Sequence, residues 1–186
     1  MTLGYGLLGL IAAFIGYLIY AYNALVKNKN LKDEGWSGID VQLKRRADLI
    51  PNLIQTVKGY ATHEDKLFRD IADLRAKSIA GGTVGEQSAV GQAMSAALGR
   101  LFAIAEAYPE LKADANFRDL QDKLAIVEDE IQLSRRYYNG AVRNLNTLIE
   151  SVPTNTIAGY FKFEKAEFFE IGDAAAREVP KVDFKV

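Results

Sequence analysis

Cysteine is absent from the 186-residue chain, and histidine occurs once, as His63. The absence of cysteine excludes disulfides, thiolate metal sites, cysteine nucleophiles and a lipid anchor attached to a cysteine. A lone histidine leaves a transition-metal site without a second imidazole, and no nucleophile-elbow sequence accompanies it. Gly81 and Gly82 lack the Lys-Ser/Thr pair of a phosphate-binding loop. We therefore expect no enzymatic activity, no metal and no cofactor.

An excess of positive charge is also missing. Lysine and arginine total 23 against 24 aspartate and glutamate residues, which gives a formal net charge of -1. A protein that binds nucleic acid needs a cationic surface that displaces counterions from the phosphates. A nucleic-acid partner is therefore not expected.

Charged side chains are absent from Thr2 to Val26, a run of 25 residues. A hydrocarbon core about 30 Å thick needs roughly 20 apolar helical residues, so the run is long enough to span a bilayer. A cleaved signal peptide would carry a basic segment before a shorter apolar stretch. A helix without charge on any face has no side that suits water, which argues against its being a helix of a soluble protein. The sequence predicts one transmembrane anchor in contact with the lipid bilayer.

The residues that flank this run predict its orientation. Basic residues cluster after it, at Lys27, Lys29, Lys32, Lys44, Arg45 and Arg46, and none precedes it. By the positive-inside rule the N-terminus lies outside and the C-terminal domain lies in the cytoplasm, although the opposite orientation stays open. Within the run, Gly9, Ala13 and Gly16 share one helix face, on which a second transmembrane helix can approach closely. Self-association through this face is one hypothesis, and the general abundance of Gly and Ala in membrane helices is the alternative.

The rest of the chain has the periodicity of long helices. Apolar residues recur three or four apart from 33 to 80, with a kink or break expected at Pro51. Thr83 and Glu86 form a capping-box pattern before a second helix that Pro109 should end. Asp114 is the expected N-cap of a helix that reaches Val152. Its heptad seam consists of Phe117, Leu120, Leu124, Val127, Ile131, Ser134, Tyr138, Ala141, Leu145, Leu148 and Val152.

These segments predict an all-α protein. The expected organisation is a transmembrane anchor at 1–27, an antiparallel up-and-down bundle of three to four helices at 28–153, and an aromatic-rich tail at 154–186. The tail could be a strap whose aromatic side chains cover the bundle, or an exposed peptide. Exposed aromatics would favour aggregation, so the strap is preferred.

One set of polar residues lies where long bundles often hold buried ion pairs. It comprises Arg46, Asp48, Asn52, Glu106, Glu128 and Arg135. Ion pairs of this kind commonly fix helix register, so a structural role is the default and partner binding is the alternative. His63, beside Glu64, is expected to be a surface residue rather than a metal ligand.

Four segments resemble the LemA family: YNALV at 22–26, DVQLKRRADLIPNLIQTVKGYATHE at 40–64, EAYPELKADANFRDLQ at 106–121 and RRYYNGAVRNLNTLIESVP at 135–153. PKVDF at 180–184 extends the similarity. The chain departs from the family pattern in VEDEI at 127–131, where Asp129 and Glu130 replace an amide and a cation. The resemblance implies an inner (cytoplasmic) membrane protein with an N-terminal anchor and a helical domain. It implies no enzymatic activity, and relatives in magnetosome-forming bacteria are associated with membrane vesicles.

Two functions from different classes follow. The first is a non-enzymatic, self-associating membrane scaffold that organises the membrane or a membrane protein complex, and it predicts a homo-oligomer. The second is a cytoplasmic-side adaptor or sensor that binds a protein or small ligand through the polar centre near Arg46 and Arg135.

Overall fold

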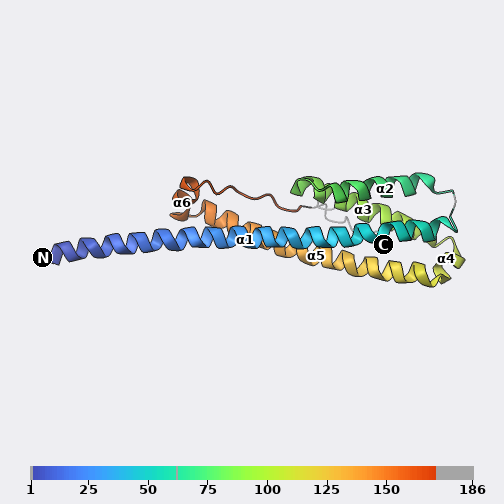
Figure 1. Cartoon of the computed structure of the whole chain (residues 1–186), viewed down its shortest axis with the longest axis horizontal. Helices are drawn as coiled ribbons and strands as arrows, with labels where there is room; N and C mark the ends of the chain where they lie inside the picture. The colour runs from blue at the N-terminus through green and yellow to red at the C-terminus, as the bar shows by residue number, and fades with distance from the viewer. Residues whose placement is uncertain (1, 62, 171–186) are drawn as a thin grey trace, which may run out of the picture. The chain divides into compact units, whose positions relative to one another are not determined.

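The computed structural model describes residues 2–61 and 63–170, and within those ranges the chain is helical without any strand. The helices are α1 (Thr2–Lys58), α2 (Asp65–Ala80), α3 (Val84–Ala105), α4 (Pro109–Ala113), α5 (Ala115–Glu150) and α6 (Thr154–Tyr160). An extended segment at 161–170 follows α6 (Figure 1). The predicted all-α bundle behind a long apolar N-terminal helix is confirmed.

Two compact units divide the chain, and α1 and α5 contribute residues to both. Unit 1 contains residues 1–42 and 126–168, and unit 2 contains residues 43–125 and 169–186. Residues 171–186, which include the PKVDF motif and the last 16 residues of the predicted tail, lie outside the described residues.

Unit 1 is built on two antiparallel helices, the first part of α1 and the second part of α5. Near one end Leu25 packs with Leu145, and farther along the Trp36 ring lies 5.7 Å from the Tyr138 ring. The closest backbone approach is at Gly35, where a Cβ atom would lie 3.0 Å from the Tyr138 Cα. Because a methyl group at this spacing would be crowded against the α5 backbone, glycine at position 35 favours the close approach of the two helices.

Helix α6 covers one end of this helix pair. Ile157 and Ala158 of α6 are buried against Ala21 and Leu25 of α1 and Leu145 of α5. Figure 1 shows α6 beside α1 and the end of α5. The apolar residues of the α5 heptad seam are buried from Phe117 to Leu145 and Ser134 among them is half-buried, but Val152 is 83% exposed because α5 ends at Glu150.

Unit 2 encloses the larger core. The end of α1, α2, α3, α4 and the start of α5 contribute buried side chains, among them Ile50, Leu53, Ile71, Met94, Leu101, Leu111 and Phe117. Helices α2 and α3 form a pair joined by the glycine loop. The predicted capping box is confirmed, because Glu86 N donates to Thr83 Oγ1 at 3.2 Å and Thr83 N donates to Glu86 Oε2 at 2.7 Å.

The local signals at the ends of helices have mixed outcomes. Asp114 caps α5 as predicted, since Phe117 N donates to its Oδ1 at 2.9 Å. The helix expected over 33–80 is instead interrupted after Lys58, where Gly59 begins a turn and Ala61 N still donates to Val57 O at 2.9 Å. Pro51 does not break α1. Pro109 begins α4 rather than ending α3, because a proline at the first helical position has no N–H that needs a partner.

Candidate functional site

The predicted polar set is not gathered in one buried place. Asp48, Asn52 and Glu106 are exposed, and Glu106 Oε2 forms an ion pair with Lys112 Nζ at 2.5 Å. Glu128 and Arg135 are half-buried residues of unit 1. Arg46 is buried in unit 2, with 1% of its surface exposed.

Arg46 connects α1 to α3 within unit 2. Its Nη1 donates to Ser95 Oγ at 3.2 Å, and Ser95 Oγ donates in turn to the Gly91 carbonyl oxygen at 3.1 Å. A Cβ atom at Gly91 would lie 3.7 Å from Arg46 Nη2, so the guanidinium packs closely on α3. Arg46 therefore joins the two helices through a buried polar contact, as expected for a structural role, because an arginine keeps its charge when buried. Among the described residues, no three potential metal ligands gather, and His63 is exposed.

The apolar beginning of α1 forms an exposed surface. From Gly4 to Gly16 every residue is exposed, including Tyr5 at 73% and Leu10 at 71%. Its mean hydropathy reaches 1.7 over a window in which 6% of the residues are buried, so length and composition suit a membrane span. Gly9, Ala13 and Gly16 lie on this surface, and nothing within 4 Å would meet a Cβ atom at either glycine. A core helix of a soluble protein would be mostly covered, and this segment is not.

Aromatic side chains gather where the exposed surface of α1 meets α6. The Tyr22 ring lies 4.7 Å from the Phe161 ring and 6.0 Å from the Phe163 ring. The Tyr17 hydroxyl lies 3.3 Å from Thr154 Oγ1, within hydrogen-bond distance. Tyr160 is 81% exposed and Phe161 is 51% exposed. The sequence predicted Tyr160 and Phe161 only as part of an aromatic tail, whereas the structure places them against α1.

Two side chains of α5 form hydrogen bonds with the backbone of the extended segment. Asn146 Nδ2 donates to the Ala166 carbonyl oxygen, and Ala166 N donates to Asn146 Oδ1, both at 2.9 Å. The buried Tyr138 hydroxyl donates to the Glu167 carbonyl oxygen at 2.9 Å. Burial raises the pKa of the Tyr138 phenol, with a further contribution from the negative charges of nearby acidic residues. Of the two alternatives for the tail, the described part resembles a strap, although Tyr160, Phe161 and Phe168 remain exposed.

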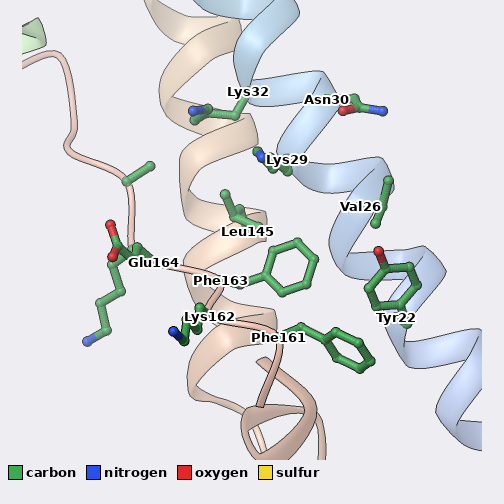
Figure 2. Close-up of a pocket in the computed structure, with 12 residues that line it drawn as sticks. Tyr22, Val26, Lys29, Asn30, Lys32, Leu145, Phe161, Lys162, Phe163 and Glu164 are labelled. Carbon is green, nitrogen blue, oxygen red and sulfur yellow. The ribbon is translucent and has the colours of Figure 1, made fainter. Parts of the chain in front are cut away.

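Two hollows flank the aromatic cluster in unit 1. The first is an apolar groove of about 490 Å³ lined by Leu18, Ile19, Tyr22, Thr156, Ile157, Tyr160 and Phe161. The second is a cavity of about 620 Å³ that shares Tyr22 and Phe161 with the groove and adds Lys29, Lys32, Lys162 and Lys165. Figure 2 shows the Tyr22 and Phe161 rings at the lower end of the cavity in that view and Lys32 toward its upper end. The apolar groove and the lysine-lined cavity are therefore adjacent.

The charge pattern of the cavity is uneven. Glu164 is its one acidic lining residue against four lysines. Lys32 pairs with Asp33 at 2.6 Å, and Lys165 pairs with Glu150. Within the described part of the chain, no ion pair engages Lys29 or Lys162. One signal in the sequence marks this site: the stretch from Ser151 to Phe161 carries no charged side chain, and Lys162 follows it directly.

Known proteins with similar sequences include magnetosome proteins. Magnetosome protein MamQ 1 and Magnetosome protein MamQ 2 of Paramagnetospirillum magneticum are each 27% identical over an alignment of 186 positions, which covers 86% of this chain and 68% of the relative. Protein LemA of Metamycoplasma hominis is 26% identical over 175 positions, covering 91% of this chain and 77% of the relative. Together with the exposed apolar helix, these relatives indicate a membrane-associated protein.

The family assignment rests on a match to most of the chain. The model of the LemA family matches residues 35–184, from the middle of α1 into the segment beyond the described residues. This range includes the three longer motifs noted in the sequence. The chain belongs to the LemA family.

Proposed function

We propose that this protein is a membrane-anchored, non-enzymatic scaffold that self-associates and organises the membrane or a membrane protein complex. The observation that carries the proposal is the exposed apolar surface of α1, which covers every helix face from Gly4 to Gly16. Such a surface is stable in a bilayer and unfavourable in water. The name of the magnetosome relatives supports a role in a specialised membrane compartment.

Self-association is proposed to occur through the face that carries Gly9, Ala13 and Gly16. Small side chains let two helix backbones approach closely, so dispersion contacts and weak hydrogen bonds form between them. In the single chain this face contacts nothing, because no atom lies within 4 Å of a Cβ atom at Gly9 or Gly16. A second copy of α1 is the partner that fits a narrow apolar face of this shape.

Disulfide crosslinking tests the proposed interface directly, because the chain has no native cysteine. With Ala13→Cys in membranes, oxidation should yield a crosslinked dimer. The same treatment of Ile11→Cys, on the opposite helix face, should yield much less. Adding Gly9→Leu and Gly16→Leu should reduce the Ala13→Cys product strongly, whereas the matched change Gly4→Leu should not.

Equal crosslinking of the two single-cysteine chains would refute the specific interface. A monomer in nanodiscs at every protein density would contradict self-association as a whole.

The proposed orientation places unit 2, and the part of unit 1 that follows the apolar run of α1, in the cytoplasm. The basic residues that follow α1's apolar segment support it through the positive-inside rule. A single cysteine at Gln132, an exposed position of α5, provides the measurement. An impermeant maleimide should label Gln132→Cys only after the membrane is permeabilised, and labelling in intact cells would reverse the orientation.

A further inference from the structure

We propose that the apolar groove and the lysine-lined cavity of unit 1 form one binding site for an anionic phospholipid. The acyl chain would lie in the groove between α1 and α6, and the phosphate would face the lysines. The inference depends on the proposed membrane anchoring of α1, but it does not depend on self-association.

The depth of the groove along α1 supports the acyl-chain half of the site. Lys27 is the first charged residue after the apolar run, and Leu18 in the groove precedes it by nine residues. At 1.5 Å per residue this separation is about 13 Å. A bilayer's polar layer is only about 5–7 Å thick on each side. With Lys27 at the water boundary, Leu18 lies among the acyl chains, and so does the adjoining wall of α6.

The composition of α6 fits that depth. The eleven residues from Ser151 to Phe161 contain no charged side chain. Their apolar groups face outward at Val152, Tyr160 and Phe161, which are 83%, 81% and 51% exposed. Tyrosine is favoured at membrane interfaces because its ring is apolar and its hydroxyl is polar. Surfaces of this kind are unfavourable in water, whereas they match the boundary between headgroups and acyl chains.

The charges next to the groove support the headgroup half of the site. Lysines 29, 32, 162 and 165 come from two segments that α6 brings together, and they line a cavity that shares Tyr22 and Phe161 with the groove. Lysine stems can lie along apolar surface while their ammonium groups reach toward headgroup phosphates. Each lysine near an anionic lipid surface contributes an attraction of about 1 kcal/mol, or roughly fivefold in affinity.

The backbone conformation of Lys162, one of the four lysines that line the cavity, is unusual. Its φ of 57° lies in the left-handed region, which favours glycine. A lysine at this position places an ammonium group at the cavity, as Figure 2 shows, at a backbone cost that glycine would avoid. The cost is consistent with a binding role for the side chain.

The test uses full-length protein, one copy per nanodisc, with a single tryptophan as the reporter. Trp36 is the only native tryptophan, so Trp36→Phe with Tyr160→Trp moves the reporter to the groove. Trp36→Phe with Tyr137→Trp is the matched control, because Tyr137 lies on α5 and is 49% exposed. Phosphatidylglycerol or phosphatidylcholine with brominated acyl chains, at low mole fraction, quenches tryptophan only on contact.

We expect tryptophan at position 160 to be quenched and tryptophan at position 137 to be unaffected. Brominated phosphatidylglycerol should quench at lower mole fraction than brominated phosphatidylcholine. Replacing Lys29 and Lys162 with glutamine should reduce this preference by roughly fivefold per lysine. The control pair Lys44→Gln and Lys66→Gln, at exposed positions of unit 2, should leave it unchanged.

Three results would overturn the site. They are quenching no greater than that of the control position, equal quenching by the two lipids, and a preference that survives loss of both lysines. Glycerol phosphate that displaces the brominated lipid as well as intact phosphatidylglycerol does would mean a free-phosphate site instead.

Two further measurements keep the outcome readable. Lipid retention by the unmutated chain in native mass spectrometry, with phosphatidylglycerol favoured over phosphatidylcholine, checks the result without tryptophan substitutions. Failure of the chain to enter nanodiscs would refute anchoring itself, and a monomeric protein that still selects phosphatidylglycerol would refute only self-association.

Discussion

The close approach of α1 and α5 at Gly35 gives a sharp prediction, because Gly38 provides a matched control on the same helix. Both glycines lie inside α1, so replacing either with alanine gains about 1 kcal/mol of helix propensity. A Cβ atom at Gly38 would meet only Ser134 Oγ at 3.9 Å, an ordinary contact. Gly38→Ala should therefore stabilise unit 1 by up to about 1 kcal/mol.

The same change at Gly35 meets a different environment. The added Cβ atom would lie 3.0 Å from the Tyr138 Cα and 3.1 Å from the Tyr137 Cδ1. The tyrosine ring can rotate away, but the backbone of α5 can yield only if the helices separate. Overpacking of this kind costs about 1–3 kcal/mol. After the gain in propensity, Gly35→Ala should be neutral to destabilising by about 2 kcal/mol, so the two variants should differ by about 1–3 kcal/mol.

Denaturant unfolding of the full-length protein in detergent, followed by Trp36 fluorescence, measures this difference. Trp36 lies between the two glycines and packs on Tyr138, so its emission reports on this contact. Gly35→Ala as stable as Gly38→Ala, or more stable, would refute the close approach. Full rescue of Gly35→Ala by Tyr137→Ala would show that the ring, rather than the α5 backbone, causes the strain.

Three other predictions concern the extended segment that follows α6, the capping box of α3 and Lys162 in the lysine-lined cavity. Asn146→Ala removes both hydrogen bonds between Asn146 and Ala166, each worth about 1 kcal/mol. Amide exchange in the extended segment, measured by hydrogen-exchange mass spectrometry, should therefore accelerate roughly 30-fold. Asn146→Asp keeps the acceptor for the Ala166 N–H and should have a smaller effect. The pKa of the Glu86 carboxyl is lowered because Thr83 donates to it, so its contribution to stability is complete above the ordinary glutamate pKa and is lost as the pH falls through the lowered value. The melting temperature of Glu86→Gln should therefore fall less over that acidic range than the melting temperature of the parent chain. Identical dependence of the two melting temperatures on pH would contradict this reasoning. Lys162→Gly should stabilise the protein by up to about 1 kcal/mol in thermal unfolding while it weakens phosphatidylglycerol selection, and a loss on both measures would argue against backbone strain at this position.

Local signals in the sequence predicted much of the fold. The capping box at Thr83, the N-cap at Asp114 and the buried seam of α5 depend on residues three or four apart, so they are legible without tertiary structure. The prolines were less informative: of the kink or break expected at Pro51, the break does not occur, and Pro109 begins a new helix because its first turn accepts a residue without an N–H. Gly59 ended α1 although the apolar period continued across it, since a turn there lets α2 fold back into the core of unit 2.

The sequence by itself determined that the chain is helical, that its first segment is apolar on every face, and that it belongs among the relatives whose motifs it shares. Only the tertiary structure decided that Lys29 and Lys162 line one cavity, that Tyr22 stacks near Phe161, and that Gly35 touches the backbone of α5. These pairs lie more than a hundred residues apart. Periodicity gives the face on which a side chain lies, whereas antiparallel packing sets the register that brings two distant faces together.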